Sequence, residues 1–349
     1  MKRGKTVLFA AIAAGLSLAM VGGALELVLR WRYKPPISPE CVKTHPHRRY
    51  TLRPGCRGTS LEAPLLVNAL GLRERERAPD AAAYRVAVLG DSITFGQGVP
   101  AEETFSHQLE LQLAQRVKTP VQVFNFGVPS YNTASEHQYL VEAFDRFSPN
   151  LVVVEFTASN DTIWEGGLKS QSPAQVWLKD LIRWSYTYEW FSRKIHQLRY
   201  QMSRDTKIGD REIFNQAVFA DDYPGWRDAQ NHITEMARFC RAKNVPLLFA
   251  IFANNGNLAP TAEGDRMYPV IQKIKVALRA AGVTHVVVFD DGFREYAGKE
   301  AALWVTPTDA HFSARAHELA ANALLDHIET HREALRVVGW KPPLQATSQ

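Results

Sequence analysis

The chain has 349 residues, of which 46% are hydrophobic and 22% are charged. A chain of this length and composition can bury the core of one large α/β domain with additions. Its formal net charge is +5, and that value alone suggests a polyanionic partner such as nucleic acid. Residues 1–34 hold six basic residues and one acidic residue, so this segment carries the whole excess. Because the rest of the chain is neutral overall, the charge does not indicate nucleic-acid binding, and no nucleic-acid partner is expected.

The N-terminal segment, residues 1–36, is predicted to be a membrane anchor. The stretch from Thr6 to Leu25 contains no charged residue, and about 20 helical residues span the hydrocarbon thickness of a bilayer. The apolar run continues past Glu26, which favours an uncleaved, single-pass helix in the inner (cytoplasmic) membrane. Basic residues flank it on both sides, so we expect the large C-terminal part in the periplasm from the free N-terminus and the lack of a second apolar span in the sequence. A cleaved signal peptide is the alternative, because Gly22-Gly-Ala24 offers small residues to a peptidase.

Residues 37–83 are predicted to form a linker followed by an irregular arm. Two interpretations remain open for its cysteines, Cys41 and Cys56: a disulfide formed in an oxidising compartment, or two unpaired structural residues. Cys240, which lies within a helical pattern, is expected to be a buried free thiol.

Strand and helix patterns alternate over residues 84–331 and predict one domain. Short apolar runs typical of buried strands occupy 86–89, 121–126, 151–156, 246–252 and 285–289. Helical spacing occupies 105–117, 135–147, 229–243, 268–281 and 314–331. This alternation predicts an α/β fold, namely a three-layer αβα sandwich with a parallel five-stranded sheet. Residues 332–349 are expected to form a C-terminal tail.

Residues 162–228 interrupt the alternation between the third and fourth strands. This insertion is rich in aromatic residues and also carries basic ones. Its position predicts that it lies over the carboxyl edge of the sheet, where lids and substrate walls are built. A helical pair packed on the domain surface and a face at the membrane interface are the alternatives.

The first strand ends in Gly90-Asp-Ser92, at the kind of position where open α/β sheets place catalytic groups. The following Gly96-Gln-Gly98 lacks the third glycine of a dinucleotide fingerprint, and the stretch is neither a P-loop nor a G-x-S-x-G elbow. A serine becomes a nucleophile only when a base takes its proton. Asp309 and His311, just before the last helix, are the candidates: the carboxylate holds one imidazole nitrogen and the other faces Ser92.

Two further strand ends carry groups suited to a developing oxyanion. The turn from Asn125 to Thr133 follows the second strand and can offer a backbone N–H, and Asn160 follows the third strand and can offer its amide. A metal site at Asp309 and His311, or at His45 and His47, is the competing interpretation. Neither pair has a third and fourth ligand at recognisable spacing, so no metal is expected.

In these blocks the chain resembles the SGNH hydrolases, also called GDSL esterases/lipases. The matching residues are Gly90-Asp-Ser92 with Thr94, the turn 125–133, Ser159-Asn-Asp161 and Asp309-Ala-His311. The likeness covers residues 66–160 and 245–330, and not the insertion at 162–228. It implies an SGNH/flavodoxin-like hydrolase domain over 84–331 that needs no cofactor.

The resemblance also implies a role for each site residue. Ser92 would be the nucleophile, His311 the general base and Asp309 the acid that orients it. The oxyanion hole would comprise the backbone N–H groups of Ser92 and Ser130 and the side chain of Asn160.

Two residues depart from the family pattern. By our alignment the family's glycine is replaced by Ser130, whose side chain would crowd the site. Most members space the last pair as D-x-x-H, whereas here Thr308 stands at the acid position and Asp309 is one residue nearer. Asp290 and Asp291, after the fifth strand, are therefore rival acids. The shorter spacing resembles SGNH-like proteins that handle O-acetyl groups on envelope polysaccharides.

The sequence thus predicts a serine esterase acting on an acyl or acetyl ester of a cell-envelope glycan or lipid. An O-acetyltransferase that uses the same triad on an envelope polysaccharide is one alternative. A catalytically silent glycan-binding module is the other, and the presence of both Ser92 and His311 argues against it.

Overall fold

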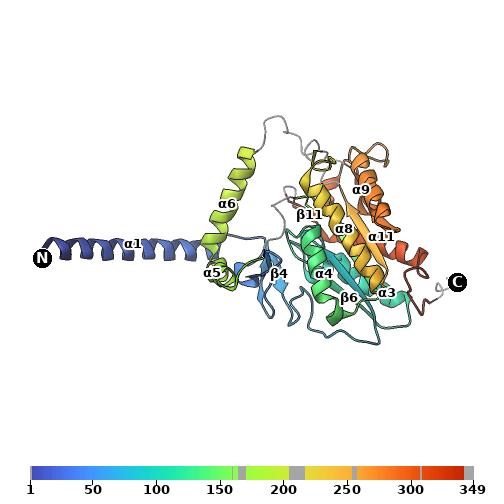
Figure 1. Cartoon of the computed structure of the whole chain (residues 1–349), viewed down its shortest axis with the longest axis horizontal. Helices are drawn as coiled ribbons and strands as arrows, with labels where there is room; N and C mark the ends of the chain where they lie inside the picture. The colour runs from blue at the N-terminus through green and yellow to red at the C-terminus, as the bar shows by residue number, and fades with distance from the viewer. Residues whose placement is uncertain are drawn as a thin grey trace.

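The computed structural model describes residues 2–158, 160–163, 170–203, 217–253, 258–306 and 309–341 (Figure 1). Ser159 and Thr308 of the predicted blocks lie outside these ranges, as do parts of the insertion. Helix α1 (Lys2–Arg32) projects from the rest of the molecule as a single rod. Its segment Thr6–Arg32 is 27 residues long, unburied, and apolar enough to cross a membrane, as an anchor or a signal sequence does.

A parallel five-stranded sheet forms the centre of the molecule, in the order β6-β5-β7-β8-β9. The strands are β5 (Tyr84–Gly90), β6 (Val121–Gly127), β7 (Leu151–Thr157), β8 (Leu247–Phe252) and β9 (His285–Val288). This confirms the predicted fold class. The chain leaves β5 toward β6 on one side and returns to β7 on the other. The strand order therefore reverses at the carboxyl end of β5, which is where such sheets bind their ligands.

Helices cover both faces of the sheet. The first face carries α3 (Phe105–Arg116) and α11 (Ala314–Thr330), and the second carries α4 (Thr133–Phe147), α8 (Pro224–Ala242) and α9 (Tyr268–Ala280). Strand β7, with the sequence LVVVEFT, is buried at every position, as expected for a central strand covered on both sides. The two apolar cores hold the sheet edge rigid and so fix the loops that follow each strand.

The N-terminal arm consists of two small hairpins, where the sequence predicts irregular structure. Strand β1 (Val42–Thr44) pairs with β2 (Tyr50–Leu52), and β3 (Arg57–Ser60) pairs with β4 (Ala63–Leu66). Strands of three or four residues are too short to show an alternating pattern, so periodicity misses them. Cys41 and Cys56 form a disulfide, and Cys240 is buried and free.

The insertion contains a helical pair, α5 (Pro173–Arg183) and α6 (Tyr186–Ser203). Ser172 and Gln175 form a reciprocal capping box at the start of α5, and Pro173 occupies its first turn. The Asp180 carboxylate accepts a hydrogen bond from the Thr44 N–H at 2.5 Å, which ties α5 to the arm. Helix α6 contacts the end of α1.

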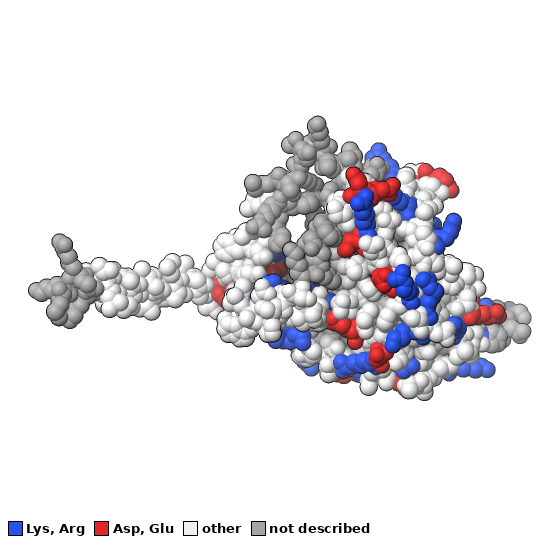
Figure 2. Space-filling view, viewed as in Figure 1, with Lys and Arg blue, Asp and Glu red and all other residues white. Residues whose placement is uncertain are grey.

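Smaller elements complete the domain. They are α2 (Ser92–Phe95), α10 (Phe289–Phe293), a hairpin of β10 (Trp304–Thr306) and β11 (Asp309–Phe312), and 3-10 turns at Pro39–Cys41, Ala101–Glu103, Arg294–Tyr296 and Glu300–Leu303. Residues 332–341 pack on the domain: the Tyr84 hydroxyl donates to the Leu335 carbonyl at 2.9 Å. Basic and acidic side chains are interspersed on the face of the domain in Figure 2, whereas the stretch of α1 from Thr6 to Leu25 carries no charged side chain.

Candidate active site

Ser92 lies at the first turn of α2, directly after β5. Asp91 caps this short helix, because its carboxylate accepts a hydrogen bond from the Ile93 N–H at 2.7 Å. Gly127, at the end of β6, packs against the same helix so closely that a Cβ there would lie 2.2 Å from the Phe95 nitrogen. Asp91 is therefore engaged in holding the loop, and Gly127 in letting α2 approach the sheet.

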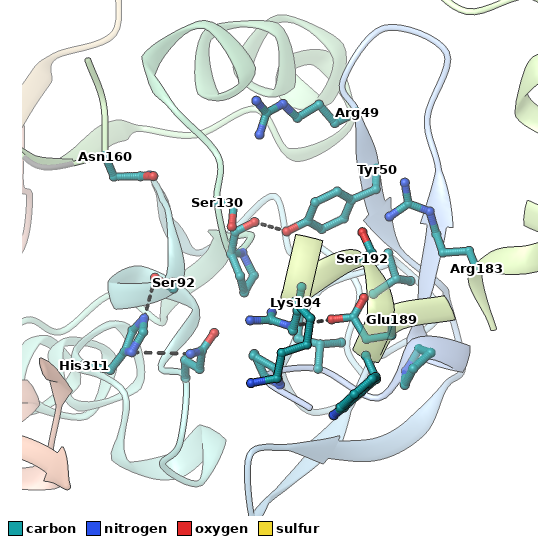
Figure 3. Close-up of a pocket in the computed structure, with 18 of the residues that line it drawn as sticks. Arg49, Tyr50, Ser92, Ser130, Asn160, Arg183, Glu189, Ser192, Lys194 and His311 are labelled. Carbon is teal, nitrogen blue, oxygen red and sulfur yellow. Dashed lines mark hydrogen bonds and ion pairs between the residues drawn. The ribbon is translucent and has the colours of Figure 1, made fainter. Parts of the chain in front are cut away.

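His311 and Asp309 lie on strand β11, where the sequence predicts a loop. The pairing of β11 with β10 fixes the backbone that carries both side chains. His311 Nε2 lies 2.8 Å from Ser92 Oγ (Figure 3), and its Nδ1 contacts the Asp309 carboxylate. That carboxylate also accepts the His311 backbone N–H at 3.1 Å. These hydrogen bonds hold the pKa of Asp309 below its usual value, so it stays ionised beside the ring.

The two rival acids are engaged elsewhere. Asp290 is buried and accepts the Ala253 N–H at 2.9 Å, and burial raises its pKa to about 7. Asp291 pairs with Arg294 at 2.9 Å. Of the three predicted candidates, only Asp309 contacts the imidazole in the structure.

Three candidate oxyanion donors, from Ser92, Ser130 and Asn160, line the cleft that holds the Ser92 hydroxyl. The Ser92 N–H belongs to the first turn of α2, where N–H groups have no partner within the helix. Ser130 is exposed and has a left-handed backbone, with φ of +61°, a conformation that glycine adopts more easily. Asn160 Nδ2 donates one hydrogen to the Tyr131 carbonyl. An amide nitrogen carries two hydrogens, so the second remains for a ligand in the cleft.

These residues open into one large cleft of about 1040 Å³. Figure 3 shows Ser92, His311, Ser130 and Asn160 on its inner wall and side chains of α6 opposite them. The remaining wall comes from the arm and from the residues just after α1. The insertion thus lines the cleft, as its sequence position predicts.

The structure also shows two supporting residues that the sequence does not single out for this role. Arg73 of the arm is buried, and its guanidinium donates to the carbonyls of Phe95 at 2.7 Å and Gly96 at 2.5 Å. It therefore fixes the loop after the nucleophile helix. The Gln97 amide nitrogen lies 3.3 Å from His311 Nδ1. The signal available in the sequence was the position of Gln97 between two glycines, Gly96 and Gly98, and both of these have a positive φ in the structure.

Four buried carboxyl groups lie behind Ser92: Asp91, Glu136, Glu155 and Asp161. Two of these carboxyl groups accept hydrogen bonds from threonine hydroxyls: Glu155 from Thr157 at 2.6 Å, and Asp161 from Thr133 at 2.7 Å. Among the residues that the structure describes, neither carboxylate oxygen of Glu136 has a hydrogen-bond partner. Burial, and then repulsion from Asp161 and the other acids, raises the pKa of Glu136 well above its usual value. Burial raises the pKa of Asp91, Glu155 and Asp161 as well, so the environment disfavours the ionised form of all four groups.

Glu136→Gln should stabilise the fold, and by more at pH 8 than at pH 4. Glutamate ionises near pH 4 in an unfolded chain, whereas burial keeps Glu136 protonated in the folded state. Folding then takes up a proton above that pH, so the contribution of Glu136 to stability falls as pH rises. Glutamine does not ionise, so the variant avoids this pH-dependent loss of stability. Its free energy of unfolding at pH 8 should exceed that of the parent by about 1–3 kcal/mol.

Thermal unfolding at the two pH values measures this effect. Asp145→Asn, an exposed change on the same helix α4, is the matched control and should give no such pH-dependent gain. Equal melting temperatures for Glu136→Gln and the parent at pH 8 would contradict the buried, protonated state.

The histidines predicted as a second metal candidate have structural partners. His45 Nδ1 accepts the backbone N–H groups of His47 and Arg48, and its Nε2 faces Glu142 at 3.4 Å. Within the described ranges, neither this pair nor Asp309 and His311 belongs to a group of three ligands close enough to hold a metal.

A serine hydroxyl, an imidazole and a carboxylate in this order, at the switch point of a parallel sheet, form an arrangement typical of serine-dependent acyl hydrolases. The model of the GDSL-like Lipase/Acylhydrolase family matches residues 88–319. The chain belongs to this family of SGNH/GDSL esterases and is an ester-hydrolysing enzyme.

Solved structures with similar folds include other members of this group. An esterase EstA from Pseudoalteromonas sp. is 13% identical, with 72% of this chain and 99% of that chain covered and a TM-score of 0.41. A lipase/acylhydrolase from Enterococcus faecalis is 14% identical, with coverage of 71% and 96% and a TM-score of 0.42. A catalytic mutant of Axe2, an acetylxylan esterase from Geobacillus stearothermophilus, is 15% identical, with coverage of 72% and 96% and a TM-score of 0.40. No curated protein sequence matches this chain.

Proposed function

We propose that this enzyme is a membrane-anchored, extracytoplasmic serine esterase that hydrolyses an acyl or acetyl ester of a cell-envelope glycan or lipid. The observation that carries the proposal is the 2.8 Å contact of His311 Nε2 with Ser92 Oγ, with Asp309 on the other ring nitrogen. The site opens into a cleft that is large enough for a sugar or a lipid headgroup.

The acylation step follows from this arrangement. Ser92 Oγ attacks the ester carbonyl carbon while its proton passes to His311 Nε2, and the carbonyl oxygen becomes an oxyanion. The N–H groups of Ser92 and Ser130 and the Asn160 amide donate to that oxygen. Asp309 stabilises the imidazolium that forms. His311 then gives the proton to the departing alcohol oxygen, which leaves an acyl group on Ser92.

Deacylation repeats the sequence with water. His311 takes a proton from a water molecule, the resulting hydroxyl adds to the acyl carbon, and the same three donors bind the second oxyanion. When the intermediate collapses, His311 returns the proton to Ser92 Oγ. A carboxylic acid leaves and the serine is restored.

Two features support an extracytoplasmic location. The Cys41–Cys56 disulfide suits an oxidising compartment. Helix α1 has the length and composition of a membrane span, and residues after its end line the cleft. A retained anchor would therefore hold the active site close to the membrane.

The substrate class is tested with a panel of esters offered to the full chain: acetylated sugars, p-nitrophenyl esters of graded length and lysophospholipids. A sugar acceptor added to each assay separates hydrolysis from transfer, because a transferase forms an acylated sugar in place of the free acid. Turnover of none of these esters by the parent, where a general esterase is active, would contradict the proposal.

Asn160→Ala should lower kcat by about 10²–10³ with little change in KM, as the loss of one oxyanion donor does. Asn160→Asp is the matched variant, because it keeps the shape of the side chain and removes the N–H. It should lose at least as much. A change that falls wholly on KM in both variants would assign Asn160 to substrate binding instead.

Ser348→Cys, near the C-terminus, should react with a membrane-impermeant maleimide while the inner membrane is intact. Cys240 is buried and the other cysteines are paired, so the new thiol takes the label. Lys2→Cys, on the other side of the span, is the control and should react only after the inner membrane is opened. The reverse pattern would place the enzyme in the cytoplasm.

A further inference from the structure

Helix α6 has two chemically distinct faces. Tyr188, Phe191, Ile195 and Leu198 are all exposed, although they are large and apolar. Their spacing of three, four and three residues places them on one side of a helix. The residues that line the catalytic cleft, among them Glu189 and Arg193, lie on the opposite side. One face of α6 thus borders the substrate site, and the other presents an uncovered apolar stripe.

Helix α5 repeats this division. Trp177, Leu178, Leu181 and Ile182 are exposed on one side, with Trp177 66% accessible. The other side contacts the arm through the hydrogen bond of Asp180 with Thr44. The two helices contact each other and together expose tryptophan, tyrosine, phenylalanine, leucine and isoleucine side chains. A soluble surface rarely leaves so many uncovered.

The anchor helix fixes where this apolar surface lies. Glu26 of α1 accepts hydrogen bonds from the backbone N–H groups of Tyr186 and Thr187, at 3.0 and 2.9 Å, and so caps the start of α6. Arg30 of α1 lies over the rings of Trp184 and Tyr186. Glu26 is the first charged residue after the apolar stretch, so these contacts would place α6 at the boundary of a bilayer that α1 crosses.

The direction of α6 agrees with this position. Figure 1 shows α6 running across the direction of α1, with the catalytic domain on the side away from the anchor. When α1 spans the bilayer, α6 lies along the membrane surface. Trp184 and Tyr188 are of the types enriched at that level, and the cationic Arg30 and Arg32 suit anionic lipid headgroups.

We propose that the apolar faces of α5 and α6 lie in the interfacial zone of the bilayer that α1 crosses, and that the cleft takes its ester from an amphiphile held there. Tyr33 and Ile37, just after the anchor, line the cleft, so its wall begins at the membrane surface. The wall carries four basic side chains and one acid, Glu189, which is paired with Arg193. This charge suits an amphiphile with an anionic headgroup. The second half of the inference rests on the proposed esterase function.

The location of the two helices is tested without reference to activity. Single cysteines at Phe191 and Ile195 carry an environment-sensitive fluorophore, and the full chain is placed in nanodiscs of phosphatidylethanolamine and phosphatidylglycerol. Spin-labelled lipid should quench both labels strongly. Val276→Cys is the matched control, since Val276 is an exposed apolar residue on the distant helix α9, and it should stay unquenched.

Quenching at Phe191 and Ile195 no greater than at Val276 would overturn the proposal. A second copy of the chain seated on this face would give that same unquenched result, because protein and not lipid would then cover the labels.

A rate ratio tests the source of the ester. The rate on lysophosphatidylglycerol held in nanodiscs is divided by the rate on a water-soluble p-nitrophenyl ester. The ratio should fall about tenfold in Phe191→Glu, because a buried carboxylate weakens interfacial binding. It should stay within about twofold of the parent in Val276→Glu. An unchanged ratio in Phe191→Glu overturns the membrane source, whereas activity that survives Ser92→Ala would reject the esterase mechanism instead.

A separate cluster of three histidines lies at the opposite edge of the sheet. His285 begins β9, His327 lies in the last turn of α11, and His331 follows that helix. One nitrogen from each lies within 4.8 Å of the others, and His327 Nε2 is 3.4 Å from His285 Nδ1. Tetrahedral zinc with imidazole ligands at about 2.0–2.1 Å places their nitrogens about 3.3 Å apart.

The ring of His331 is already oriented for such a role. Its Nδ1 lies 3.0 Å from the His327 backbone carbonyl, to which it donates, so the lone pair is on Nε2. We infer that these three histidines bind a divalent transition metal such as Zn²⁺, with water completing the shell, and that the metal ties the end of α11 to the edge strand β9.

Titration calorimetry of the full chain with Zn²⁺ tests this site. One site should be seen, it should vanish in His327→Ala, and bound Zn²⁺ should raise the melting temperature of the parent alone. His331→Ala serves as the second variant, because this exposed residue is not part of the core. His232→Ala is the control, since that histidine lies in another pair. Zn²⁺ binding that persists in both His327→Ala and His331→Ala would overturn the site.

Discussion

Ser92→Ala should abolish esterase activity and leave the fold intact. Loss of a nucleophile that works as a unit with its base lowers turnover by about 10⁴–10⁶. The hydroxyl is positioned for this role by two elements, the short helix α2 and strand β11, which brings His311 Nε2 to 2.8 Å from Ser92 Oγ. The substitution removes one oxygen and leaves both elements in place.

The measurement is kcat on an ester that the parent clearly turns over, with the melting temperature as a check of folding. The melting temperature should change little, because Ser92 is only partly buried and alanine is a good helix former. Activity within tenfold of the parent, at an unchanged melting temperature, would rule out the serine mechanism.

Asp309→Asn has the second largest expected effect, a loss of about 10⁴ in kcat. Asparagine keeps the size of the side chain, but its amide favours the imidazole tautomer that cannot take the serine proton. The ionised Asp309 carboxylate accepts from both the ring and the backbone N–H of His311, so the change acts on the orientation and on the charge of the base.

Asp290→Asn and Asp291→Asn are matched controls for the acid. Asp291 is paired with Arg294, and Asp290 holds the Ala253 N–H, so both changes should leave kcat within about tenfold. A double variant, Thr308→Asp with Asp309→Ala, restores the more common family spacing. Recovery of activity in this double variant would show that the acid position tolerates a shift of one residue. A nearly silent Asp309→Asn beside a damaging Asp290→Asn or Asp291→Asn would move the triad acid to helix α10, directly after the fifth strand.

The central sheet and the candidate site residues were accessible to sequence analysis for local reasons. Each core strand is a run of apolar residues followed by a polar turn, and the predicted runs fall within the observed strands or differ from them by one residue at an end. The residues Ser92, Asn160 and His311 stood out because they combine reactive side chains with positions just after strands or before the last helix. Their contacts could not be read in the same way, since Ser92 and His311 are separated by 219 residues.

Other features depend on pairing across the fold. The hairpins of the arm and the β10–β11 hairpin hold strands of three or four residues, which carry no period of their own and form only because a partner strand is near. The choice of Asp309 over Asp290 and Asp291 likewise depended on where β11 lies relative to the fifth strand.

The sequence by itself determined the anchor-like helix and the fold class, and it nominated the candidate reacting groups, because hydrophobic period, chain length and side-chain chemistry are local properties. The tertiary structure alone decided which of these groups meet. It brought Asp91, Glu136, Glu155 and Asp161 into one buried cluster, and it joined Glu26 of the anchor to the start of α6. Such contacts arise when distant segments bury surface together, and no pattern within a single segment encodes them.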